Sequence, residues 1–259
     1  MHQVSRWIID GRIYLLRFNS PLSQKLALGR ASVWLEDVLY ANEIVEQIPS
    51  GFSGGVANYS GHNMRVISFC EFLNTCKRLG KQLFREEEKL KTVLIANAIV
   101  RTNKIGEFES ACVKDKDEWN EEKSAILAVC SSSDKEEVKD ALIHEAMHGM
   151  FYVNQKFRKF CYEFWETELD AKERALWINF LVNLRYNAEK DEEIAVNELQ
   201  AYMSTERKLF EVTGNKSNDE THTLKGIQIK FSASAKKQNA SNILNHTPSI
   251  GQSCKVVWM

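Results

Sequence analysis

Residues 124–152, SAILAVCSSSDKEEVKDALIHEAMHGMFY, join an apolar segment almost directly to an amphipathic one. The apolar part, 124–131, has the composition of a buried strand. Ser132, Ser133 or Asp134 can then accept hydrogen bonds from the first free amides of a helix, and the acidic pair that follows suits the positive end of the helix dipole. The stretch therefore predicts a strand that runs into a long helix.

His144 and His148 lie four residues apart within that helix. Successive helical residues rotate by roughly 100°, so the two imidazoles share one face and can converge on one ion. Glu145 lies beside them and can take a proton from a water held there and pass it to a leaving amine. This spacing is the HExxH arrangement of zinc metallopeptidases. The alternative is an amphipathic helix whose two imidazoles are paired with backbone or carboxylate groups.

A catalytic zinc ion needs a third protein ligand and an open position for water. The extended HExxHxxGxxH pattern would need a glycine and a histidine where the chain has Phe151 and Asn154, so that pattern fails. A glutamate from a second helix is the other source. Glu198 lies 50 residues after His148, which is far enough for the chain to turn back and pack two helices antiparallel. The rival third ligands are Glu192 and Glu193.

Residues 125–205 resemble the gluzincin metallopeptidases, the thermolysin-like clan, in their order of strand, HExxH helix, intervening helices and glutamate-bearing helix. The segment NELQAY, residues 197–202, matches the NExxA surroundings of the ligand glutamate in that clan. The resemblance implies a zinc metallopeptidase that acts on peptides or proteins, with Glu145 as general base and then general acid. The ligands that it implies for one Zn²⁺ ion are His144, His148 and Glu198.

Tyr202 stands where the thermolysin pattern has an aspartate that supports a zinc histidine. A phenol does not fix an imidazole as a carboxylate does, so this support is altered here. A tyrosine can instead donate a hydrogen bond to the oxyanion that forms during hydrolysis, and we therefore take Tyr202 as a second candidate catalytic residue. The sequence does not choose between it and four other donors: Tyr152, Tyr186, Arg185 and His62.

The whole chain predicts an α+β, mainly helical fold, in which a small antiparallel or mixed sheet leads into the HExxH helix and a helical lobe carries the third ligand. We expect a mainly helical N-terminal region with a glycine-rich loop over 1–98 and a zincin-like core over 99–212. Peripheral strands and a mobile tail are expected over 213–259, all within one compact domain.

Local patterns in the N-terminal region predict a hairpin around Asp10-Gly11, a helix over 31–48, and an irregular surface loop over 49–63. His62 and Tyr59 are expected to be solvated in that loop. Helical spacing continues over 68–94, with a break at Gly80.

The apolar segments within 106–113 and 124–131 are expected to be neighbouring antiparallel strands. By the resemblance, one of them would take a substrate peptide as an added strand. Two helices are predicted on either side of Leu169-Asp170 and another over 191–210. Short strands are predicted at 224–231 and 254–259. The aromatic core candidates are Phe157, Phe160, Phe164, Trp165, Trp177 and Phe180.

The charge balance argues against nucleic acid and anionic membranes as partners. The 34 basic and 35 acidic side chains give a formal net charge of −1, and no basic patch interleaved with aromatic residues is present. The N-terminal segment has charged residues among its apolar ones, and the six cysteines are scattered, so we expect a cytoplasmic protein with reduced thiols. Secretion from a trimmed precursor stays open.

Two other functions are compatible with the same residues. One is a catalytically silent zincin-fold protein that binds a partner. The other is a metal-dependent hydrolase of a non-peptide amide. The sequence does not indicate substrate preference or oligomeric state.

Overall fold

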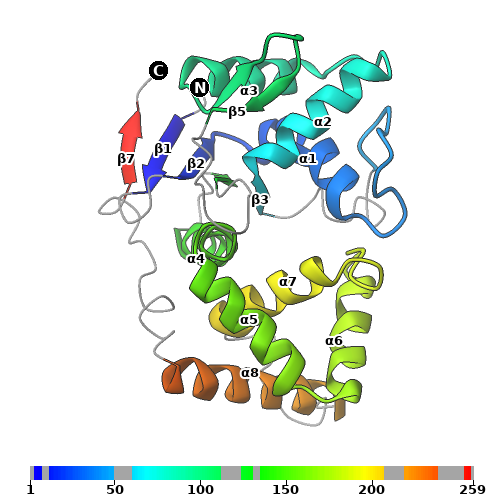
Figure 1. The fold of residues 1–259 in the computed structure, drawn as a ribbon, viewed down its shortest axis with the longest axis vertical. Helices are drawn as coiled ribbons and strands as arrows, with labels where there is room; N and C mark the ends of the chain where they lie inside the picture. The colour runs from blue at the N-terminus through cyan, green and yellow to red at the C-terminus, as the bar shows by residue number, and fades with distance from the viewer. Residues whose placement is uncertain are drawn as a thin grey trace.

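The computed structural model of the chain describes residues 3–7, 12–49, 60–111, 124–130, 135–206, 219–238 and 254–257. Within these ranges the fold is α+β and mainly helical, with a small mixed sheet, as the sequence predicts (Figure 1). The helices of the first hundred residues and those from residue 135 onward pack against opposite faces of the sheet. None of the helices in the described part of the chain combines the length and the apolar run that a membrane crossing needs.

The main sheet has the strand order β3-β6-β2-β1-β7. Its strands are β1 (Gln3–Trp7), β2 (Ile13–Phe18), β3 (Gly61–Arg65), β6 (Ala125–Cys130) and β7 (Cys254–Val257). The expected N-terminal hairpin is confirmed, because β1 and β2 pair antiparallel. The strand expected near the C-terminus is also confirmed, since β7 pairs with β1.

The expected pairing of the two apolar segments before the HExxH helix is wrong. Strand β5 (Phe108–Ser110) pairs with β4 (Val100–Thr102) in a separate sheet of two strands. Strand β6 instead lies between β2, to which it is parallel, and β3, to which it is antiparallel. All six residues of β6 are buried, and a continuous apolar run of this kind suits a central strand covered on both faces.

The glycine-rich segment is only partly a loop. Residues 50–59, which include Tyr59, lie outside the described residues, but residues 61–63 belong to β3. His62 is therefore buried, not solvated. Successive side chains of β3 point to opposite faces of the sheet. His62 contacts Ser32 on one face, and Asn63 contacts Glu145 on the other.

The first helical layer contains α1 (Pro21–Glu36), α2 (Val66–Arg78) and α3 (Arg85–Ala96). The helix predicted over 31–48 is wrong in its bounds. It begins earlier because Ser20 caps the helix and Pro21 suits its first turn. It ends at Glu36 because the Asp37 carboxylate accepts hydrogen bonds from the amides of Leu39 and Tyr40, which favours a turn. The break at Gly80 is confirmed, with φ of 65°.

The second helical layer contains α4 (Lys135–Val153), α5 (Gln155–Thr167), α6 (Ala171–Asn183), α7 (Glu192–Thr205) and α8 (Asp219–Lys237). The two helices around Leu169-Asp170 are confirmed, and Asp170 caps the second of them. The strand predicted at 224–231 is wrong, because these residues lie within α8. Leu224, Ile227 and Phe231 form its buried face at helical spacing. The predicted cap of α4 lies outside the described residues.

Side chains of β6 alternate between two cores. Ala125, Leu127 and Val129 pack with α4–α8, while Ile126 and Ala128 pack with α1–α3. The aromatic core candidates from α5 and α6 lie in the first of these cores, five of them buried and Phe180 partly buried. The four cysteines of the described part that are free thiols, Cys70, Cys76, Cys130 and Cys161, are also buried.

Candidate metal centre

Helix α4 lies close against the sheet. Strand β6 ends at Cys130 and α4 begins at Lys135, so the strand leads almost directly into the helix, as predicted. A Cβ added at Gly149 would stand 3.2 Å from both Ile13 Cδ1 and Leu127 Cδ1. The absence of a side chain at Gly149 thus permits the close approach. The other side of α4 packs against α7 and carries the histidines toward it.

His144, His148 and Glu198 converge at the contact of α4 with α7, and together they could hold a metal ion. The two Nε2 atoms are 3.1 Å apart. Glu198 Oε2 lies 3.8 Å from His144 Nε2, and Glu198 Oε1 lies 3.7 Å from His148 Nε2. Two donors at about 2.1 Å from a tetrahedral ion are about 3.4 Å apart, so the spacing of these atoms fits such an ion.

Hydrogen bonds on the far side of each ring fix the histidine tautomers. His148 Nδ1 lies 3.0 Å from Asn197 Oδ1, an oxygen that can only accept. His144 Nδ1 lies 3.3 Å from Thr205 Oγ1, whose own hydroxyl proton is donated to Ala201 O at 2.8 Å. Both Nδ1 atoms therefore carry hydrogen. Each Nε2 presents a lone pair to the other.

Glu198 adds further lone pairs to the same point. It is buried, and its Oε2 has no hydrogen-bond partner among the described residues. A buried acceptor without a donor is costly, and three groups that face one another with lone pairs repel. A cation bound between them would satisfy all three groups at once. The donor set therefore fits a divalent metal.

Electrostatics at the site favour the same conclusion. Burial lowers the pKa of His144 and of His148 to about 4 each, so both are neutral at pH 7, and the neutral imidazole is the form that binds metals. Burial raises the pKa of Glu198. Burial, and then repulsion from Glu198, raises the pKa of Glu145 to about 8. An ion bound here would favour the ionised carboxylates.

Glu36, at the end of α1, is a further carboxyl that sequence reasoning missed. Burial, followed by repulsion from Glu198 and Glu145, raises its pKa well above the usual value. No local pattern near Glu36 indicates that it lies near Glu198 and Glu145, because α1 reaches the site only through the tertiary fold.

Two residues of strand β3 contact the carboxylate of Glu145. Its Oε2 accepts a hydrogen bond of 3.1 Å from Asn63 Nδ2. A Cβ added at Gly61 would stand 2.2 Å from Glu145 Oε1, so the carboxylate fills the space that a side chain would need. Neither Gly61 nor Asn63 is a predicted site residue. Both lie in a glycine-rich segment of the sequence, and such segments are typical of loops.

Tyr202 lies beside the three residues that could hold a metal ion. Its ring packs edge-on against His144 with the centroids 4.9 Å apart, and it also contacts Trp177 and Phe180. The polar support of the histidines comes instead from Asn197 and Thr205. These two lie eight residues apart on α7 and pair with histidines four apart on α4, in reverse order. The antiparallel packing of the two helices stays a prediction. The catalytic role of Tyr202 stays a prediction.

The other candidate oxyanion donors each have a hydrogen-bond partner within the protein. Tyr152 is hydrogen-bonded to Asn63 and Asn197, and Tyr186 is hydrogen-bonded to Glu198. Arg185 donates to Asp37 at 3.2 Å. His62 Nδ1 lies 2.9 Å from Ser32 Oγ on the opposite face of the sheet, and its Nε2 has no hydrogen-bond partner among the described residues.

The rival third ligands have other partners. Glu193 forms ion pairs with Arg65 and Arg158. Glu192 accepts a hydrogen bond of 3.3 Å from Trp165 Nε1. Among the described residues, the cluster that could hold an ion contains Glu198 and neither of these two glutamates.

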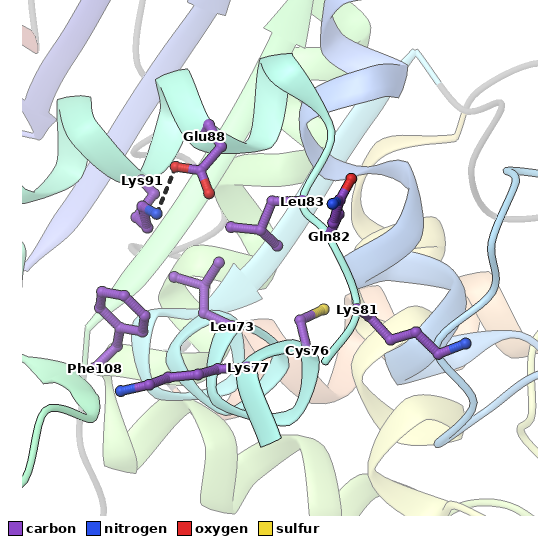
Figure 2. Close-up of a pocket in the computed structure, with 9 residues that line it drawn as sticks. All are labelled: Leu73, Cys76, Lys77, Lys81, Gln82, Leu83, Glu88, Lys91 and Phe108. Carbon is purple, nitrogen blue, oxygen red and sulfur yellow. Dashed lines mark ion pairs between the residues drawn. The ribbon is translucent and has the colours of Figure 1, made fainter. Parts of the chain in front are cut away.

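A pocket of about 430 Å³ lies between α2, α3 and β5, and none of its lining residues belongs to the possible metal site (Figure 2). Lys77, Lys81 and Lys91 contribute to its lining. Each amine already has a partner: Gly106 O for Lys77, Glu46 for Lys81 and Glu88 for Lys91. Cys76 and Glu88 also line the pocket, but neither belongs to the group of described residues that could hold a metal ion.

Comparison of the chain with protein-family models, with curated proteins and with solved structures gave no match. The gluzincin resemblance therefore stays a prediction from residues 125–205. That His144, His148 and Glu198 could hold a metal ion rests on their own geometry.

Proposed function

We propose that this protein is a zinc-dependent metallopeptidase. One observation carries the proposal: two neutral imidazoles and a buried carboxylate converge with tetrahedral spacing, and the carboxylate of Glu145 lies on the same helix beside them. His144, His148 and Glu198 would hold the ion. When bound, zinc supplies a Lewis acid and lowers the pKa of a coordinated water to about 7.

Glu145 is suited to move the proton in this reaction. Asn63 occupies its Oε2, so Oε1 is the oxygen left to receive a proton from water. Burial also favours the protonated carboxyl, which helps Glu145 keep that proton until it is passed to the leaving amine. The base and the acid would thus be one residue used twice.

Strand β3 is the best candidate to align the substrate. The strands expected to do so are excluded by the sheet order, because β6 is paired on both edges and β5 belongs to a separate sheet. In the described sheet β3 is the outer strand next to α4, and Gly61 and Asn63 lie directly against Glu145. An extended peptide added along β3 would pass close to the proposed general base.

Metal removal tests the proposal. The purified chain should contain about one zinc ion per molecule and should cleave members of a peptide library. Cleavage should stop after treatment with 1,10-phenanthroline and return when zinc is added, because the ion is needed to activate water.

Three other outcomes would each change the proposal. Zinc without turnover would contradict peptidase activity and leave a binding protein. Chelator-sensitive cleavage of small amides, with peptides left intact, would reassign the substrate. Iron in place of zinc would contradict the choice of metal.

Gly61→Ala should lower kcat by about 100-fold, because a displacement of roughly 1 Å at a catalytic group can cost that much. The new Cβ would stand 2.2 Å from Glu145 Oε1, so the carboxylate must move. Zinc content should stay unchanged. Gly226→Ala is the matched control, since a Cβ there meets no atom within 4 Å. Full activity in Gly61→Ala would mean that Glu145 is not held by β3.

A further inference from the structure

A continuous row of hydrogen bonds connects a proposed metal ligand to the proposed general base. His148 Nδ1 contacts Asn197 Oδ1 at 3.0 Å, and Asn197 Nδ2 donates to Tyr152 Oη at 3.0 Å. Tyr152 Oη donates to Asn63 Oδ1 at 2.8 Å, and Asn63 Nδ2 donates to Glu145 Oε2 at 3.1 Å. We call these five residues the relay. They come from α4, α7 and β3.

Every link of the relay has the same direction. Asn63 donates through its amide nitrogen to Glu145 Oε2 and accepts through its oxygen from Tyr152. The phenol then donates to Asn63 and accepts from Asn197. This turns the oxygen of Asn197 toward His148, which must carry its hydrogen on Nδ1.

A second donor agrees with that orientation of Asn197. Gln200 Nε2 also donates to Asn197 Oδ1, at 3.1 Å. Glu145 Oε2 as acceptor and the Nδ1–H tautomer of His148 are therefore compatible with one another through three intervening side chains. The lone pair of His148 Nε2 is left for the ion.

Tyr152 is the centre of the relay, and its hydroxyl contacts neither the metal ligands nor Glu145. The ring is buried, and the guanidinium of Arg65 lies 4.8 Å from its centroid. Arg65 is in turn paired with Glu193, which also pairs with Arg158. The phenol is thus fixed in place by packing and charge on one side and by two hydrogen bonds on the other.

We propose that Tyr152 is a positioning residue that holds His148 and Glu145 as one unit, so that the ligand's tautomer and the base's orientation are set together. The proposal rests on the function proposed above. Its physical basis is that groups hydrogen-bonded to metal-ligating histidines fix ring orientation and tautomer, and their loss costs about 10–100-fold in metal affinity or activity. Here one hydroxyl would serve both the ligand and the base.

Tyr152→Phe tests this in the full chain. We expect zinc affinity, measured by competition with a chelator, and kcat each to fall by about 10–100-fold, with KM little changed. The visible spectrum of the Co²⁺-loaded protein should also change. Tyr14→Phe is the control, because Tyr14 is likewise buried but packs on the opposite face of the sheet.

A second variant measures the coupling between the His148 end and the Glu145 end of the relay. Asn63→Ala should cost much less in the Tyr152→Phe background than alone, because the relay is already broken there. Fully multiplicative losses would overturn the proposal. So would zinc affinity, Co²⁺ spectrum and kcat in Tyr152→Phe that match the wild type. If Tyr152→Phe does not fold, Asn63→Ala alone should still alter the Co²⁺ spectrum.

The tautomer of His148 gives a readout that needs neither metal nor turnover. Long-range ¹H–¹⁵N NMR should show the Nδ1–H form in the wild type and a mixture in Tyr152→Phe. An unchanged tautomer would count against the relay. A wild type that shows the Nδ1–H form but binds no zinc and cleaves no peptide would instead contradict the proposed function alone.

Discussion

Glu145→Gln is expected to abolish peptide hydrolysis while the protein keeps its zinc. Glutamine has the shape of glutamate, and its side-chain carbonyl can still accept the hydrogen bond from Asn63. It cannot accept a proton from water at neutral pH, so general base catalysis is lost. Removal of such a group costs about 10²–10⁴-fold. The measurements are kcat on a cleaved peptide and zinc content by mass spectrometry.

Glu163→Gln is a suitable control for this change, because Glu163 lies on the surface of α5 and pairs with Lys159. It should retain both activity and zinc. Full activity in Glu145→Gln would remove Glu145 from the mechanism. Loss of zinc in that variant would mean that Glu145 supports the ion, and the two roles would have to be reassigned.

Glu198→Ala is expected to lose the metal, and activity with it. The substitution leaves two imidazoles from one helix and removes the only carboxylate of the cluster. Zinc affinity should fall by more than the roughly 100-fold that loss of a group behind a ligand costs. Glu192→Gln is the control, since this rival glutamate is hydrogen-bonded to Trp165 instead. Unchanged zinc content in Glu198→Ala would reassign the third ligand.

Glu198→Gln adds a signed prediction about stability. With a chelator present, the variant should unfold at the same temperature as the wild type or higher, because it no longer buries a carboxylate near Glu145 and Glu36. With zinc present, the wild type should be the more stable, because an ion that binds only the folded state stabilises it. Thermal unfolding of both proteins, once with chelator and once with zinc, measures this reversal in their order of stability. A wild type that zinc does not stabilise would contradict the assignment.

Local patterns were sufficient for the elements that carry the cluster. The spacing of His144 and His148 follows from the helical period, and the caps and apolar stripes of α5, α6 and α7 are also local features. The same reasoning failed at 224–231, where an apolar run short enough for a strand belongs to a longer helix. Periodicity does not separate these two cases when the run is short.

What the sequence alone determined is the set of groups that could bind a metal: a histidine pair on one helix face, with Glu145 beside it and Glu198 on a second helix. What only the tertiary structure decided is how these groups are supported. Asn63 is 82 residues from Glu145, and Tyr152 is 89 residues from Asn63. Such contacts depend on which strand lies beside β6, and sheet pairing between distant segments leaves no periodic trace in the chain.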